Sequence, residues 1–395
     1  MMKSSSTPNH ILPLIVFAQF AGTSLWFATN AVIADIQEAF SLPSEVVGDI
    51  TSAVQFGFIV GTLLFAILSI ADRFSPVLVF LYSAILGAIF NLSIIYWAQG
   101  LTFIIIARFA VGVCLAGIYP VGMKIASDWY AAGLGKALGY LVGALVLGTA
   151  FPHLLNILGH TFSWTMVLWS TSILAIAGAV LLYLFLSDGP HRKSGSTFKW
   201  NVIPHIFKVK AFRSAAFGYF GHMWELYAFW SFVPLILITY NDSHQSALPV
   251  SLWSFVIIGV GSLGCIIGGY ISLKRGSAQV AFGMLLISGI GCLLSPLFFH
   301  FAPIVFLGAL MIWGFTVVGD SPQFSTIVVQ TAPKEYIGTA LTIVNCIGFS
   351  LTIVSIQLIQ YLQHMLPTTM LFLVLVIGPV LGLWVLGRGS LFTFS

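Results

Sequence analysis

Three ionisable residues stand inside long apolar stretches of the sequence: Arg108, Glu225 and Asp320. A charged side chain at the centre of a bilayer costs about 2.5–3.5 kcal/mol on insertion scales, so such residues usually face a bundle interior or a wet cavity. At a helical rise of about 1.5 Å per residue, Arg108 and Glu225 fall near the middle of their stretches, and Asp320 lies nearer one end. These residues are the first candidates for chemistry.

Glu225 lies in the segment GHMWELYA, with His222 three positions earlier and Trp224 and Tyr227 beside it. On a helix, His222 and Glu225 share one face. Chains of Asp, Glu and His carry protons in pumps and transporters, and His changes its charge close to neutral pH. One interpretation is proton coupling or substrate contact through Glu225 and His222. The alternative is a structural Glu that is hydrogen-bonded between two parts of the protein.

Asp320 belongs to the segment GDSPQFS, in which Pro322 follows two positions later. A proline inside a helix removes one backbone hydrogen bond and frees a carbonyl group of the preceding turn. Interrupted helices beside polar groups often form transporter binding sites, so Asp320 is a second candidate for proton coupling or substrate binding. The alternative is a packing kink in which Asp320 bonds to Gln323 or Lys334.

Arg108 keeps its charge at any physiological pH. It is a candidate for binding a substrate carboxylate or phosphate, or for pairing with a buried acid. The pairing is slightly favoured, because a buried charge normally needs a partner.

Aromatic and amide side chains in other apolar stretches are candidates for lining a cavity. An aromatic-lined pocket suits an amphipathic organic solute, whereas the alternative is core packing and ordinary polar contact between helices. The cavity-lining candidates are Trp26, Gln55, Trp224, Tyr227, Gln323 and Asn345.

The elements that must position these residues are membrane helices. The chain has 395 residues, of which 59% are hydrophobic and 7% charged, whereas a soluble domain carries roughly 25% charged residues. The apolar runs are continuous over about 20 residues, which fits helices and not the alternating strands of a barrel. The net charge of +4 argues against a nucleic-acid partner, and the sequence indicates no cofactor or metal site.

Hydropathy predicts twelve transmembrane helices with mostly short connections. A polar, basic stretch near the midpoint divides the chain into an N-terminal six-helix half at 1–187, a cytoplasmic linker loop at 188–212 and a C-terminal six-helix half at 213–395. The predicted spans are 12–37, 46–70, 76–97, 99–127, 134–157, 164–187, 212–238, 249–273, 278–299, 302–330, 337–361 and 367–387.

The distribution of Lys and Arg predicts the orientation of these spans. With the N-terminus in the cytoplasm, the predicted outer loops contain no Lys or Arg, and the basic residues collect on the inner side, as the positive-inside rule requires. Both termini are therefore expected in the cytoplasm. The inner side would hold Lys3, Arg73, Lys136, Arg192, Lys193, Lys199, Lys208, Lys210, Arg213, Lys274, Arg275, Lys334 and Arg388, and the outer side Asp35, Glu38, Glu45, Asp49 and Asp242.

An internal repeat connects the two halves. A shift of about 202 residues places the span 99–127 on the span 302–330, so that GVCLAGIYP aligns with GFTVVGDSP, Gly112 with Gly314 and Arg73 with Arg275. One shift serves separate helix pairs in the same order, which favours a true repeat over chance. Two halves in the same orientation imply a pseudo-two-fold axis along the membrane normal. At the repeat position of Arg108 stands Leu310.

These features resemble the major facilitator superfamily (MFS), and the resemblance covers nearly the whole chain. ADRFSP, with Asp72 and Arg73, is similar to the cytoplasmic gating loop of that family, although its leading glycine and its trailing basic residues differ. RFAVG at 108–112 resembles the fourth-span motif, in which an Arg projects into the core. A glycine-rich stretch from Gly139 to Pro152 resembles the fifth-span motif of exporters in the family.

The resemblance implies a bacterial transporter of the cytoplasmic (inner) membrane with the MFS fold. It would move a small organic solute by alternating access, with proton coupling expected, and would work as a monomer in the lipid bilayer. The rival interpretations are a channel, a membrane receptor without transport, and an intramembrane aspartyl protease, because VVGD at 317–320 resembles a GxGD motif. Val317 stands where that motif needs its first glycine, so no enzyme activity is expected.

Overall fold

The computed structural model describes residues 8–43, 46–130, 134–157, 163–192 and 198–388. Within these residues all regular structure is helical, and eleven helices are long and apolar enough to cross a membrane. They are α3 (Val46–Ile67), α5 (Pro76–Trp97), α6 (Leu101–Leu115) with α7 (Tyr119–Trp129), α8 (Leu134–Ile157), α9 (Thr165–Phe185), α11 (Lys210–His244), α12 (Val250–Gly259) with α13 (Gly261–Arg275), α14 (Ser277–Phe298), α15 (Pro303–Gly319) with α16 (Ser321–Thr331), α17 (Ile337–Leu362), and α18 (Thr368–Leu371) with η5 (Phe372–Val376) and α19 (Ile377–Arg388).

The first predicted span, 12–37, is not one helix. Helix α1 (Ile11–Thr23) has 13 residues, too few to cross a bilayer, which takes about 20. Residues 24–29 form turns, and the chain then continues through η1 (Asn30–Val32) and α2 (Ile33–Phe40). The apolar composition of 12–37 predicted a continuous helix. The helix is interrupted instead, and backbone carbonyl groups that are free at the interruption accept hydrogen bonds from a side chain of another helix.

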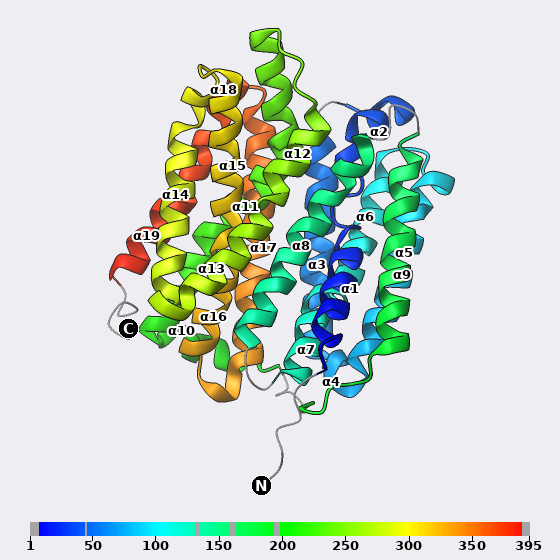
Figure 1. Cartoon of the computed structure of the whole chain (residues 1–395), viewed down its shortest axis with the longest axis vertical. Helices are drawn as coiled ribbons and strands as arrows, with labels where there is room; N and C mark the ends of the chain where they lie inside the picture. Colours follow the sequence, from blue (N-terminus) through cyan, green and yellow to red (C-terminus); the bar gives the residue numbers. More distant parts are fainter. Residues whose placement is uncertain (1–7, 44–45, 131–133, 158–162, 193–197, 389–395) are drawn as a thin grey trace.

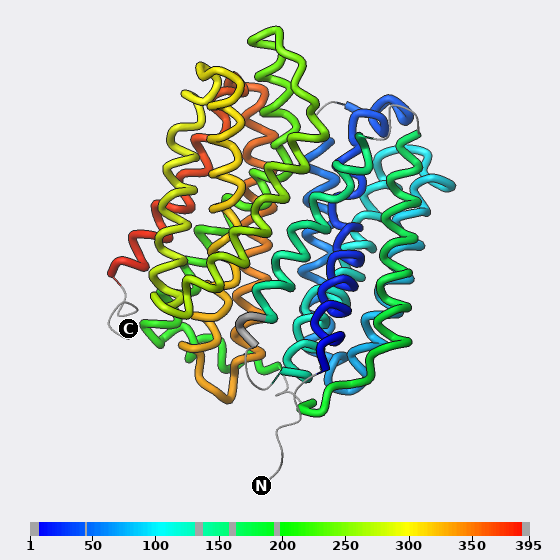
Figure 2. The backbone as a smooth tube through the Cα atoms, in the orientation of Figure 1, coloured from blue at the N-terminus to red at the C-terminus, as the bar shows by residue number. Residues whose placement is uncertain are grey.

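The helices form two groups that lie side by side (Figure 1). Helices α1 to α9 occupy one side of the molecule and α11 to α19 the other, and the backbone trace shows α8 and α12 running next to each other where the groups meet (Figure 2). Helices α3 and α17 make a second contact between the groups. The span α12–α13 packed on α8, and α17 packed on α3, thus join the two groups.

Two close helix crossings use glycines at corresponding positions of the repeat. A Cβ atom on Gly112 in α6 would lie 2.1 Å from the carbonyl oxygen of Val54 in α3, and one on Gly314 in α15 would lie 2.0 Å from that of Ile257 in α12. Only glycine lets the backbones approach this closely. Spans α6–α7 and α15–α16 also break alike, each just before a proline, Pro120 or Pro322.

The linker predicted at 188–212 is partly helical. It contains η3 (Trp200–Val202) and α10 (Ile203–Lys208), and α11 begins at Lys210. Lys3, Lys136, Lys193 and Glu45 lie outside the residues whose side chains the structure describes.

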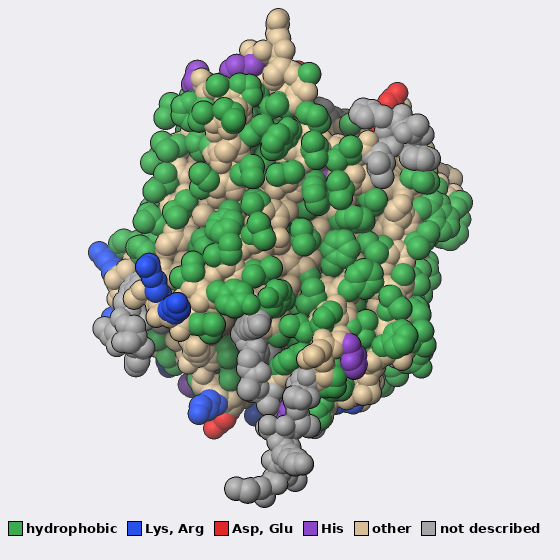
Figure 3. Space-filling view, viewed as in Figure 1, with side chains coloured by type: hydrophobic (Ala, Val, Ile, Leu, Met, Phe, Trp, Pro, Cys, Tyr) green, Lys and Arg blue, Asp and Glu red, His purple; other side chains and the backbone are tan. Residues whose placement is uncertain are grey.

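The surface of the molecule is apolar around its middle. On the face shown in Figure 3, hydrophobic side chains cover the long central band, and Lys and Arg gather at the end where the two chain termini lie. This arrangement fits a protein surrounded by lipid, with its basic end in the water on one side.

Candidate functional site

Glu225 is enclosed within the C-terminal group of helices. Its side chain has no exposure to solvent. The Trp313 indole Nε1 of α15 donates a hydrogen bond of 2.6 Å to Oε1, and the Ser288 hydroxyl of α14 donates one of 3.0 Å to Oε2. A carboxylate in apolar protein needs such donors, because an unpaired buried charge is very costly. The Cys292 thiol also lies against the carboxyl group. Neutral groups thus hold Glu225, and no cation contacts it within the described residues.

His222 and Asp320 form a second buried pair beside it. The His222 Nδ1 atom lies 2.8 Å from Oδ1 of Asp320, and neither side chain has any exposed surface. A neutral imidazole can donate a hydrogen bond from Nδ1 to the Asp320 carboxylate, and a doubly protonated imidazole forms an ion pair with it. The Asp320 carboxyl group also lies beside the start of α16 at Ser321. Two groups that can each bind a proton thus lie in direct contact inside the protein.

The break between α15 and α16 positions Asp320. Helix α15 ends at Gly319 and α16 begins at Ser321 with Pro322 in its first turn, so the carboxyl group sits at a joint where the helix is interrupted. The predicted bond of Asp320 to Gln323 or Lys334 is not seen within the described residues, and its contact is with His222. Gln323 is buried in the turn that follows Asp320.

Helix α11 directs Glu225 and His222, the partner of Asp320, to one face and Tyr227 to the other. His222, Glu225 and Phe229 face α14 to α16, whereas Tyr227 faces the N-terminal group. Residues two apart on a helix point about 200° apart. Trp224 points toward η5, where its indole Nε1 atom donates a hydrogen bond of 3.2 Å to the carbonyl oxygen of Val374.

Arg108 contacts backbone carbonyls rather than an acid. Its Nη1 atom donates to the carbonyl oxygen of Leu25 at 3.1 Å and to Oδ1 of Asn91 at 3.3 Å, and its Nη2 atom donates to the carbonyl oxygen of Trp26. Leu25 and Trp26 belong to the turn segment 24–29, where α1 is interrupted. In lipid surroundings a freed carbonyl must find a donor inside the protein, and Arg108 supplies it. The salt bridges among the described residues do not include Arg108.

Aromatic rings from both groups of helices meet at the centre. Trp26 lies against Tyr227 of α11 and Phe349 of α17, with ring centroids 5.6 Å and 5.8 Å apart and planes within 27° and 22° of parallel. Phe58 of α3 contacts both Trp26 and Phe349, and Trp230 meets Tyr227 edge-on. We call Trp26, Phe58, Tyr227, Trp230 and Phe349 the ring cluster.

Two predicted cavity residues stand next to the ring cluster. Gln55 lies one turn from Phe58 on α3 and has no exposed surface. Asn345 of α17 accepts a 3.0 Å hydrogen bond from the Tyr219 hydroxyl on α11. Tyr219 and Tyr227 lie two turns apart on one face of α11, so Asn345 borders the same interface.

At the end away from the chain termini, hydrogen bonds connect the two groups of helices. The Gln357 amide nitrogen of α17 donates to Asp49 and Ser52 of α3, at 3.1 Å and 3.0 Å, and Gln360 donates to Asp49 at 3.2 Å. Asn156 of α8 donates to the Ser251 hydroxyl of α12 at 3.1 Å. These contacts close that end of the interface.

Comparison with models of known protein families shows to which family the chain belongs. The family model described as Major Facilitator Superfamily matches residues 15–356. The chain belongs to the Major Facilitator Superfamily. No curated protein matches it at a significant level.

Membership of the Major Facilitator Superfamily makes the chain a multi-pass membrane protein and a membrane transporter that binds small-molecule substrates. Members of the superfamily are typically transporters rather than enzymes. A protease of the aspartyl type needs two aspartates together. Asp242 lies 20 residues along α11 from His222, about 30 Å at 1.5 Å per residue, whereas Asp320 contacts His222 directly, so Asp242 does not meet Asp320.

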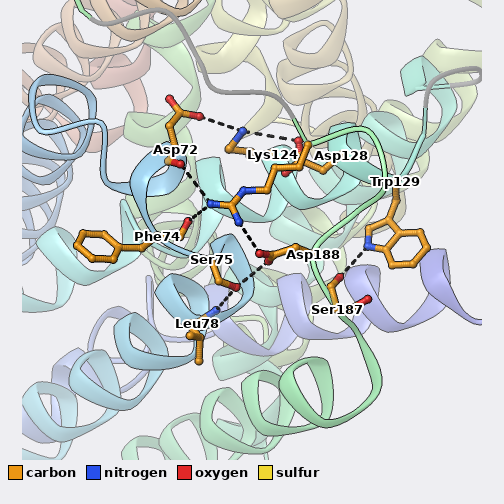
Figure 4. A network of polar contacts seen from close by, with 10 residues as sticks. Asp72, Phe74, Ser75, Leu78, Lys124, Asp128, Trp129, Ser187 and Asp188 are labelled. Carbon is orange, nitrogen blue, oxygen red and sulfur yellow. Dashed lines mark hydrogen bonds and ion pairs between the residues drawn. The ribbon is translucent and has the colours of Figure 1, made fainter.

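The residues that resemble the gating loop of the superfamily belong to a network of polar contacts around α4, shown in Figure 4. Asp72, in the short helix α4 (Ile70–Arg73), pairs with Lys124 of α7 at 3.0 Å, and Lys124 approaches Asp128 at 3.6 Å. Arg192 pairs with Asp188 at 2.6 Å and donates to the carbonyl oxygens of residues 72 and 74. Arg73 points to solvent. The network thus fastens the start of the linker to the N-terminal group.

Several residues at these sites escaped the sequence analysis. Phe58 and Phe349 complete the ring cluster, and Trp313 and Ser288 hold Glu225. The spacing of Thr51, Gln55, Phe58 and Thr62 places them on one face of α3 and was the available signal for Phe58. The partners of Glu225 lie 63 and 88 residues away in the chain, and no local pattern marks them.

Proposed function

We propose that this chain is a secondary active transporter that moves a small organic solute by alternating access and couples that movement to protons. The observation that carries the proposal is the buried set of His222, Glu225 and Asp320 in the C-terminal group. Their side chains have little or no contact with solvent, and His222 and Asp320, both able to bind a proton, lie in direct contact. Ionisable groups in such places commonly form proton relays in transporters.

Alternating access is supported by the way the two groups of helices meet. We infer that the halves 1–187 and 213–395 rock about the ring cluster, with residues 188–212 as their connection. Hydrogen bonds from the amides of Gln357 and Gln360 to the Asp49 carboxylate connect the groups at one end, and water can replace the amide donors when that end opens. The rocking of two repeats about a fixed central site is the usual mechanism of such folds.

We also infer a place in a bacterial inner membrane with both termini in the cytoplasm. The support is the positive-inside pattern of the sequence and the basic end seen in Figure 3.

The test is solute-dependent proton movement in proteoliposomes that contain a pH-sensitive dye. Adding solutes one at a time should change the internal pH for a transported solute, and Asp320→Asn or Glu225→Gln should abolish that change. Glu335→Gln removes an exposed carboxyl group and serves as the matched control that keeps the signal. Solute-driven proton movement that persists in both Asp320→Asn and Glu225→Gln overturns the assignment.

A further inference from the structure

We propose that the ring cluster takes an uncharged, flat heteroaromatic solute between Trp26 on one side and Tyr227 and Phe349 on the other. This inference names the substrate class and rests on the proposed transport function. It draws on three observations: nearly parallel rings contributed by opposite groups of helices, unpaired polar atoms in and beside these rings, and the contacts that Arg108, Glu225 and Asp320 make with other parts of the protein.

The rings already have the geometry that a flat solute needs. Trp26 belongs to the N-terminal group and Tyr227 and Phe349 to the C-terminal group, and their planes lie within 27° and 22° of parallel. Aromatic rings stack preferentially in such offset arrangements. When the two groups rock apart, the contact of Trp26 with its partners opens and exposes two ring faces. A solute ring between them restores stacking on both sides.

Unpaired polar atoms lie in the ring cluster and on the turn of α3 next to it. The indole Nε1 atoms of Trp26 and Trp230, and both amide atoms of Gln55, have no hydrogen-bond partner in the part of the chain that the structure describes. All three side chains are fully buried. Buried tryptophan nitrogens usually find an acceptor, and nearly all buried polar side-chain atoms are paired in native proteins. A bound solute with acceptor and donor atoms supplies the missing partners.

The charges near the ring cluster point to a neutral solute. Arg108 holds the backbone of Trp26, and both of its terminal nitrogens already donate to oxygen atoms of the protein. Among the Arg108 nitrogens only Nε lacks a partner in the described residues, so an anion would meet a single free donor, and a cation would be repelled by the guanidinium. The acid on α11, Glu225, is bonded to Trp313 and Ser288 on the opposite face from Tyr227. Asp320 contacts His222 on that same face, so neither of these two acids balances a positive charge at the rings.

Arg108 also explains why Trp26 can serve as a fixed wall. The turn segment 24–29 interrupts α1, and the corresponding stretch of the C-terminal group lies in the continuous helix α11. That group has Leu310 at the repeat position of Arg108. The broken helix and the Arg that binds its carbonyls thus occur together in one group only. We assign Arg108 as the positioning residue of Trp26.

The test measures binding without any gradient, by thermal shift of the purified full-length protein in detergent. The probes are nicotinamide, uracil and indole-3-acetamide, each compared with a charged analogue: nicotinate, orotate and tryptamine. Cyclohexanecarboxamide is the non-aromatic control. We expect at least one neutral probe to raise the Tm at millimolar concentration, with its charged analogue and the non-aromatic control at least about tenfold weaker.

Variants locate the binding. Trp26→Leu and Tyr227→Leu should weaken the responding probe at least about fivefold, the lower range for loss of one stacking partner, and Tyr227→Phe should retain it. Trp384→Leu removes an exposed ring, 55% accessible, and is the matched control. The proposal is wrong if no neutral probe raises the Tm, if a charged analogue binds more tightly, or if binding survives Trp26→Leu.

Failure of this inference can be told from failure of the proposed function. Proton movement driven by a charged solute would overturn the substrate class and leave proton-coupled transport intact. Binding of a neutral probe without any proton movement would overturn the coupling and leave the substrate class intact.

Discussion

Replacing Arg108 by Leu should destabilise the protein strongly, because the broken helix loses its donor. Three acceptors, the carbonyl oxygens of Leu25 and Trp26 and the Asn91 amide oxygen, depend on Arg108. Hydrogen bonds to a charged group contribute roughly 1.5–3 kcal/mol each. Removing a buried cation returns several kcal/mol of desolvation, but each of the three buried acceptors left without a donor costs about 1–3 kcal/mol. We therefore expect a net loss of about 3 kcal/mol or more.

The assay for Arg108→Leu is thermal unfolding in detergent, followed by intrinsic fluorescence. A loss of this size corresponds to a decrease in Tm of roughly 6 °C or more for a domain of 150–250 residues. Arg192→Leu is the matched control, since Arg192 also donates to two carbonyl oxygens and one side-chain oxygen. Arg192 is partly exposed, so water replaces it and about 0–1 kcal/mol is lost. Equal decreases in Tm for the two variants would refute the reasoning.

Three further changes test the packing and the contacts between the groups. Gly112→Val should lower the Tm by the equivalent of about 1–3 kcal/mol, because its Cβ would overlap the Val54 carbonyl oxygen; an unchanged Tm would disprove the close crossing. Lys124→Ala should cost about 1–3 kcal/mol, because the buried carboxyl group of Asp128 loses its ion-pair partner. An unchanged Tm in the same assay would contradict this. Asp49→Ala should speed the alkylation of Cys346, which lies between α17 and α3. The rate is measured in a protein whose other cysteines are replaced. An unchanged rate would show that Asp49 does not close the end of the interface where it bonds to Gln357.

The positions of most helices could be predicted from the sequence because hydropathy and lipid thickness set them directly. The prediction 76–97 coincides with α5 (Pro76–Trp97), where Pro76 follows the capping residue Ser75 and starts the helix locally. The interruption of the first span could not be predicted in this way. Segment 24–29 contains no Gly or Pro, and its free carbonyls are bound by Arg108, more than 80 residues away in the chain.

In the candidate site, too, contacts within one helix could be predicted from the sequence and contacts between distant helices could not. That His222 and Glu225 share a face follows from helical spacing alone, and the structure places both toward α14 to α16. The contact of His222 with Asp320 joins residues of two distant spans, so only the tertiary packing of α11 against α16 reveals it. Trp224 and Tyr227 looked equivalent in the sequence, but α11 directs Trp224 to η5 and Tyr227 to Trp26.

The most direct test of the account is the accumulation of a transported solute in proteoliposomes under an imposed pH gradient. One pH unit corresponds to about 1.4 kcal/mol per proton, so wild-type protein should build up a solute concentration ratio approaching about tenfold if one proton moves with each solute. Asp320→Asn should reach a ratio of only about one, because its proton site is lost. Wild-type protein that equilibrates the solute without accumulation, or an Asp320→Asn variant that accumulates it fully, would contradict the account.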